Sequence, residues 1–244
     1  MFRLLYTCLS TFIYETCISH RLCLFITQDP YHFSITTFIL SIVIASATAI
    51  CKMTRETALR IKAQQEHAST LLVPNSLYIA LYIRTDPPTA NDFHWAFYHH
   101  RQQQQPSPNA KVAGGRKHEA VNNPQGWCVQ HTSTGCIFKT AFLCVVIQIA
   151  EIAEARVPEM EAIMRERDDD VNEIEGVTCR VWLKGTLDRL VRDGVVECRG
   201  DLGGRDLGDV VQEEVFAIGN EFMDDAARNV QPRPMAKSKI FYDA

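Results

Sequence analysis

The sequence predicts an α+β fold, in which a small and mainly antiparallel sheet of about four to five strands packs on helices. Residues 77–84 and 92–100 alternate their side chains as strands do, and residues 178–194 have the start, spacing and end of a helix. The chain has 244 residues, of which 46% are hydrophobic and 22% are charged. This length and composition suit one globular domain with an appendage.

The appendage is a hydrophobic N-terminal segment, residues 1–52. Within it, residues 33–51 form a run of 19 residues without a formal charge, which just reaches the length of a helix that crosses a bilayer. The alternatives are an uncleaved signal segment or, since Met53 follows at once, an upstream extension that the working protein lacks. Basic residues are more frequent after the run than before it. A single-pass membrane protein would therefore hold its C-terminal domain in the cytoplasm, and a chain that starts at Met53 would be cytoplasmic.

A polar linker, residues 53–76, is expected to precede a soluble domain of residues 77–230. The domain opens with a strand at residues 77–84, which two prolines end because proline cannot donate a hydrogen bond to a ladder. The short connection to residues 92–100 predicts that these two strands pair antiparallel.

The second strand, residues 92–100, is the densest run of aromatic and histidine side chains in the chain and reads DFHWAFYHH. Successive side chains of a strand point to opposite faces, so His94 and Trp95 face opposite ways. Because both faces carry apolar groups, the pattern favours a central strand.

The remaining elements are expected downstream. Residues 117–121 form a third strand, and residues 141–150 form a buried strand, with a buried helix as the alternative because periodicity does not separate the two in so short a run. Amphipathic spacing predicts helices at residues 157–171 and 209–228. The tail, residues 231–244, gives no recognisable pattern.

The best-defined element is the helix that starts at Thr178 or Cys179. Thr178 is a suitable N-cap, and Gly194 stops a run of apolar residues at helical spacing. Cys179 therefore lies in the first turn, on the inward face.

Several kinds of site are excluded by composition and motif. The net charge of −4 and the lack of a basic block argue against a nucleic-acid partner. Nine cysteines, without a CxxC pair, favour reduced thiols over a disulfide framework. His99 and His100 are adjacent on a strand and cannot readily chelate one zinc ion, so no metal is expected. No phosphate loop, GxSxG or HExxH motif occurs, and we expect no cofactor.

The order of three short segments resembles the circularly permuted papain-like fold of lecithin:retinol acyltransferase and its phospholipid-acting relatives, with NlpC-type peptidases as more distant kin. His94-Trp95-Ala96 is similar to their histidine strand, His118 matches the polar residue of the next strand by type and order, and Cys179 matches the cysteine at a helix start by context. The acyltransferase motif around that cysteine differs, because this chain reads Thr-Cys-Arg-Val there. Residues 77–200 are also similar to uncharacterised small fungal proteins, for which no activity follows.

The resemblance implies a thiol hydrolase or acyltransferase. A helix N-terminus and an adjacent imidazolium both stabilise a thiolate, so Cys179 would be the nucleophile, His94 its base, and His118 the residue that fixes the imidazole tautomer. The substrate is not predicted, although a membrane span would suggest a lipid. The alternative is a non-catalytic, membrane-anchored domain, either an interaction module or an inactive remnant of the fold. Cysteine and histidine also occur as ordinary core residues, and this alternative predicts Cys179 sealed in the core or His94 pointing away from it.

Overall fold

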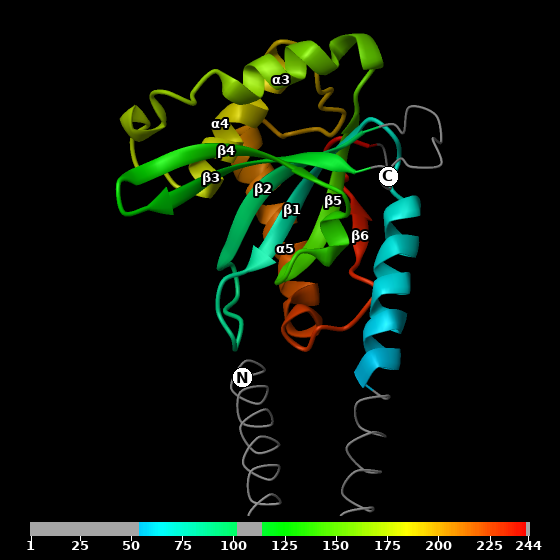
Figure 1. Ribbon diagram of the computed structural model, residues 1–244. Helices are drawn as coiled ribbons and strands as arrows, with labels where there is room; N and C mark the ends of the chain where they lie inside the picture. The colour runs from blue at the N-terminus through cyan, green and yellow to red at the C-terminus, as the bar shows by residue number, and fades with distance from the viewer. Residues whose placement is uncertain (1–53, 102–113, 243–244) are drawn as a thin grey trace, which may run out of the picture. The chain divides into compact units, whose positions relative to one another are not determined.

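The computed structural model describes residues 54–101 and 114–242. Its centre is a six-stranded sheet with the strand order β4-β3-β2-β1-β5-β6 (Figure 1). The strands are β1 Ser76–Ile83, β2 Phe93–His100, β3 Gly115–Asn123, β4 Gly126–Thr134, β5 Leu143–Glu151 and β6 Met235–Lys237. Neighbouring strands are antiparallel except for the parallel pair β5 and β6. The predicted α+β class and mainly antiparallel sheet are confirmed.

The first two predicted strands pair as expected. β1 and β2 are antiparallel along their whole length, with Tyr82 opposite His94 and Leu81 opposite Trp95. β2 lies between β1 and β3, so it is an inner strand, and all its residues except His94 are buried. The aromatic run therefore occupies the interior that its two apolar faces predicted.

Helices cover both faces of the sheet. One face packs on α3 (Val157–Arg165), α4 (Cys179–Arg192) and α5 (Leu207–Ala227), and it carries the larger core, which includes Trp95 and Trp182 (Figure 1). The opposite face carries a smaller core that includes Ala68, from the helix of residues 54–70, and Phe138. We call these the α4 face and the opposite face.

Some elements differ from the sequence prediction. α3 ends at Arg165, and a turn with a short 3-10 helix at Val171–Glu173 follows it. β4 was not predicted, because it is an edge strand whose residues are polar or half-buried and lack a clear apolar alternation. β6 was also missed, since three residues of the supposed tail carry too little pattern to predict a strand.

The prediction of a membrane-spanning protein is corrected. Within residues 54–101 and 114–242, no helix has the length and apolar character needed to cross a bilayer. The longest labelled helix, α5, carries acidic side chains along its exposed side and buries only one stripe. The run at residues 33–51, on which the prediction depended, lies outside the described residues.

The packing of α5 on the sheet gives a test of the fold. A Cβ atom at Gly219 would lie 2.8 Å from Leu81 and 2.9 Å from the ring of Phe93, so a larger side chain would push α5 off the sheet. We expect Gly219→Val to lower the free energy of unfolding by about 1–3 kcal/mol, measured by urea denaturation. The matched control is Gly185→Val on α4, where the nearest atom is 3.9 Å away, and it should change stability little. Equal losses in both variants would contradict this packing.

Candidate thiol site

The site begins at the N-terminus of α4. Thr178 is the N-cap, with extended backbone, and its hydroxyl accepts the Val181 N–H at 3.1 Å. The Thr178 carbonyl accepts the Trp182 N–H at 2.9 Å, so the helix starts at Cys179 as predicted. The first N–H groups of a helix have no acceptor within it, and they give this end a partial positive charge. The Cys179 sulfur therefore lies where a negative charge is stabilised.

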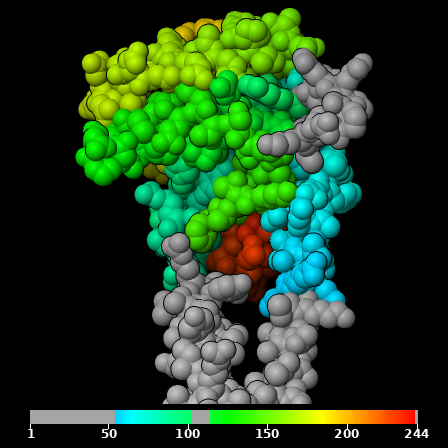
Figure 2. All heavy atoms as spheres, viewed as in Figure 1, coloured from blue at the N-terminus to red at the C-terminus, as the bar shows by residue number. Residues whose placement is uncertain are grey.

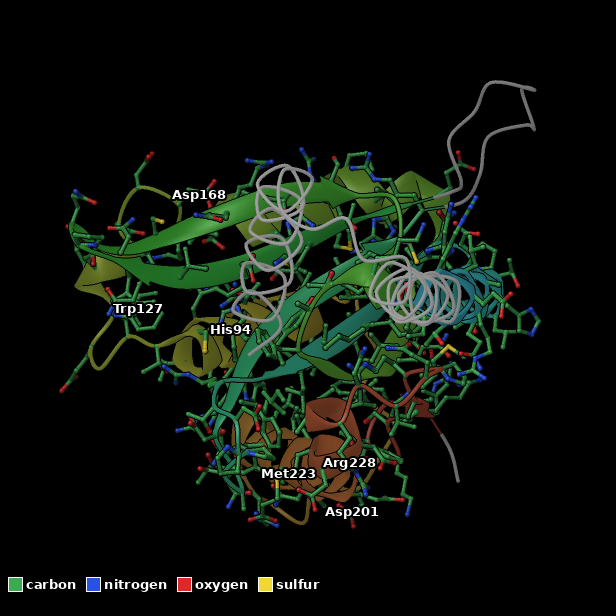
Figure 3. The ribbon with its side chains drawn as sticks, turned by 60° about the horizontal axis from the view of Figure 1, so that its bottom comes forward. His94, Trp127, Asp168, Asp201, Met223 and Arg228 are labelled. Atoms are coloured by element: carbon green, nitrogen blue, oxygen red, sulfur yellow. The ribbon has the colours of Figure 1, made fainter. Side chains whose placement is uncertain are left out.

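Two groups of β2 favour the thiolate form of Cys179. Hydrogen bonding with the imidazole of His94 and with the backbone N–H of Trp95 lowers the pKa of the Cys179 thiol, and the same pairing raises the pKa of His94. His94 lies at the start of β2, beside the helices of the α4 face (Figure 3). The imidazole is thus within bonding reach of the sulfur, as proton transfer between them requires.

The contact depends on where β3 separates from β2. The two strands pair only from Phe97 opposite His118 to His100 opposite Gly115. Toward the start of β2 the ladder to β3 is not formed, and the Trp95 N–H favours the Cys179 thiolate. His94 packs its ring against Tyr82 of the opposite face, with centroids 5.9 Å apart, although its partner Cys179 belongs to the core of the α4 face.

A carboxylate completes the arrangement. His94 Nε2 lies 2.7 Å from Glu119 Oε2, and the Glu119 side chain is only 7% exposed. The second carboxylate oxygen, Oε1, is 2.5 Å from Lys117 Nζ. Both residues lie on β3 and face the same side of it, and Lys117 also lies over the ring of Tyr82. Glu119 is therefore held by two cations, and it can fix the orientation of the imidazole.

The electrostatics favour a thiolate beside an imidazolium. Burial alone would raise the pKa of Cys179, but the hydrogen bonds from His94 and the Trp95 N–H, with the positive charges of His94 and Arg84, outweigh burial and lower that pKa. Burial likewise opposes the charged form of His94, yet the bonds to Cys179 and Glu119 raise its pKa to about 9. The same bond, with that from Lys117, lowers the pKa of Glu119 despite burial. Each of the three groups is therefore shifted toward its charged form.

The structure brings two of the three predicted site residues together. Cys179 and His94 are in contact, whereas His118 points to the α4 face and hydrogen bonds with His131, their Nδ1 atoms 2.7 Å apart. The carboxylate that contacts His94 belongs to Glu119, one residue further along β3. His118 and Glu119 lie on opposite faces of β3, and the register between β2 and β3, which sequence periodicity does not determine, places Glu119 on the side of His94.

The site is largely enclosed. Cys179 is 4% exposed, while the His94 side chain is 26% exposed. The imidazole is therefore the part of the pair that solvent reaches, and a ligand would approach the sulfur past His94. The burial of Cys179 matches the non-catalytic alternative in part, but the orientation of His94 toward it does not.

The contact between Glu119 and His94 can be tested directly. Glu119→Gln removes the negative charge that stabilises the imidazolium, so the pKa of His94 should fall, by about one unit or more. The measurement is the pH titration of the imidazole protons of His94 by NMR. Glu159→Gln, an exposed change in a separate ion pair with Arg156, is the matched control and should leave the titration unchanged. An unchanged pKa in Glu119→Gln would show that the contact is not made.

Comparison with known proteins identifies a family whose function is unknown. The chain gave no significant match to curated proteins or to solved structures. Residues 75–205 match a family of unknown function, DUF6914, and this range includes β1 to α4 and hence His94, Glu119 and Cys179. The chain belongs to the DUF6914 family of unknown function.

Proposed function

We propose that this protein is a cysteine-dependent acyl-transfer enzyme, a hydrolase or an acyltransferase, with Cys179 as nucleophile. The observation that carries the proposal is the chain of contacts from the Cys179 sulfur to His94 and from His94 Nε2 to Glu119. A nucleophile, a base within bonding reach and a third group that orients the base form the general arrangement of covalent catalysis. A cysteine at a helix start, with its histidine and carboxylate on neighbouring strands, also supports a permuted papain-like fold as the finer description of the α+β domain.

The reaction would proceed in two halves. The Cys179 thiolate attacks the carbonyl carbon of the substrate, and the tetrahedral intermediate expels the leaving group as the bond to nitrogen or oxygen breaks. The His94 imidazolium gives that leaving group its proton. Water, or an acceptor hydroxyl or amine, then loses a proton to His94 and attacks the thioester carbonyl, which releases the product and restores the thiolate.

The other groups would act by position. Glu119 accepts from His94 Nε2, which leaves Nδ1 as the ring nitrogen for the sulfur and for the leaving group. The Cys179 backbone N–H has no acceptor within α4, and it would donate to the oxyanion of the intermediate. Arg84 lies at the end of β1, where it pairs with Asp92 at 3.4 Å, and its charge favours the thiolate.

One feature of the site favours the alternative of a non-catalytic domain, namely the burial of Cys179. A sealed thiol packs as a small hydrophobe and needs no reactivity. However, an apolar environment alone would raise the pKa of that thiol, and the neighbours of Cys179 have the opposite effect. Cys144 shows the contrast, because burial raises its pKa to about 12. Where solvent reaches both thiols, Cys179 should therefore react faster with an alkylating reagent than Cys144.

The test of the proposed function is the pH dependence of iodoacetamide alkylation at Cys179 in the folded full-length chain, read by peptide mass spectrometry. We expect labelling with an apparent pKa below the ordinary value of about 8.5, because the neighbours of Cys179 lower the pKa of its thiol. His94→Ala should slow labelling at pH 7 by about tenfold or more, while the exposed-site control His67→Ala should not. Labelling of Cys179 only after denaturation would exclude the thiol enzyme.

A further inference from the structure

The sequence placed His118 at the thiol site, but the structure gives it other partners. Its side chain is fully buried on the α4 face of β3, and its Nδ1 lies 2.7 Å from Nδ1 of His131 on β4. His131 Nε2 lies 2.9 Å and 3.2 Å from the two carboxylate oxygens of Asp168, in the turn after α3. The two imidazoles thus join the β3–β4 hairpin to the segment that follows α3.

The distance between the two rings limits the number of protons they hold. Two nitrogens 2.7 Å apart share one hydrogen, so the Nδ1 atoms of His118 and His131 cannot both carry a proton. His131 Nε2 must carry a proton to bond Asp168. Of the four ring nitrogens, at most three can therefore be protonated, and His118 and His131 cannot both be imidazolium ions while this contact persists.

The charges around His118 and His131 also disfavour a second imidazolium ion in the pair. Glu161 on α3 lies 3.8 Å from His118 Nε2, but it is already paired with Arg101 at 3.2 Å and Arg116 at 3.0 Å. Arg165 at the end of α3 lies 3.5 Å from Asp168. Glu161 and Asp168 are thus already paired with arginines. A further positive charge on the histidines would find no unpaired carboxylate among these groups.

A third histidine lies in the same buried region. His99 on β2 is 1% exposed, and neither of its ring nitrogens has a hydrogen-bond partner. Its neighbours include Glu161, Arg101 and His100. A protonated His99 would therefore be a buried cation, which is costly without a partner. Within residues 54–101 and 114–242, no group of side chains is arranged to hold a metal ion, so the cluster is not explained as a metal site.

We propose that the buried histidines His118, His131 and His99 form an acid-sensitive latch that holds α3 and its following turn on the β3–β4 hairpin. When both His118 and His131 are imidazolium ions, each Nδ1 carries a proton, so the 2.7 Å contact between these atoms is lost and the repulsion of the two rings separates β4 from the turn that contains Asp168. In Figure 2 the green surface of the β3–β4 hairpin adjoins the yellow-green surface of the α3 region. Acid therefore opens the latch.

The hairpin has a second attachment near its tip. Trp127 on β4 exchanges two hydrogen bonds with the side chain of Asn172, at 2.9 Å and 2.8 Å. Neither group titrates, so this attachment is insensitive to pH. In Figure 3 Trp127 lies near the tip of the hairpin and Asp168 further along it. Opening at the histidines would leave the tip attached, so the response is a local separation.

The direction of the pH effect follows from the folded state. Burial, and then the nearby charges of His131 and Arg116, lower the pKa of His118 to about 2, and burial lowers that of His99 to about 4. A histidine with a lowered pKa in the closed state contributes its full stability above the ordinary pKa of about 6.5. That stability is lost progressively as the pH falls below about 6.5, since only the open state takes up the proton.

The latch has a consequence for the thiol site, which rests on the proposed function. His118 and Glu119 are adjacent on β3 and face opposite sides, so the strand that the latch holds also positions the carboxylate against His94. Acid opening would loosen Glu119 from His94 and reduce the reactivity of Cys179. The latch itself does not depend on catalysis.

The experiment is amide hydrogen exchange of the full-length chain at pH 7 and pH 5, with each rate divided by that of the unfolded chain so that intrinsic pH effects cancel. We expect protection in α3 and β4 to fall about tenfold or more between the two pH values, while protection in β1 and β5 falls less. His118→Gln, which cannot take up a proton, should remove most of this selective loss. His67→Gln, at an exposed histidine, should behave as the unmodified chain.

Two results would overturn the latch: an equal loss of protection across the sheet, or the same selective loss in His118→Gln. If His118→Gln does not fold at pH 7, His131→Gln provides the same test from the other side of the contact. Iodoacetamide labelling of Cys179 in the same samples separates the two proposals. An intact latch with an inert thiol excludes only the enzyme, whereas a reactive thiol without selective opening excludes only the latch.

Discussion

The candidate site depends on the separation of β3 from β2 after the pair Phe97 and His118. If the ladder continued to the start of β2, the Trp95 N–H would bond a strand carbonyl, and the sheet would keep His94 apart from the helices on the other face. The separation leaves this N–H without a ladder to β3, and it favours the Cys179 thiolate instead. At this place Cys179, at the start of α4, is paired with His94 of β2, and His94 contacts Glu119 of β3.

β3 serves two networks because its side chains alternate. Lys117 and Glu119 face the opposite side and extend the His94 contact, whereas His118 faces α3 and joins the buried histidines. A shift of this strand by one residue would exchange the two sets and destroy both. The position of β3 is therefore the structural constraint that links the proposed thiol chemistry with the proposed response to acid.

The sequence predicted the fold class, β1, β2 and the start of α4, since these have strong periodicity, turn residues or a helix cap. It did not predict β4, an edge strand with few buried residues, and it gave no basis for choosing between His118 and Glu119. That choice depends on strand register, which the apolar pattern fixes only where one face is clearly buried. The pairing of Cys179 with His94 was expected from a resemblance to known enzymes. The end of the β2–β3 ladder beside these two residues was not predicted.

The most direct test of acyl transfer by Cys179 is the reaction of the full-length protein with p-nitrophenyl acetate, followed by peptide mass spectrometry. We expect an acetyl group to appear on Cys179 together with a burst of p-nitrophenolate, and to be lost again as the thioester is hydrolysed. Cys179→Ser should abolish the burst, and Cys198→Ser, at a partly buried cysteine whose pKa burial raises, should not. Acetylation confined to lysines, or no faster at Cys179 than at Cys198, would contradict an acyl-transfer role.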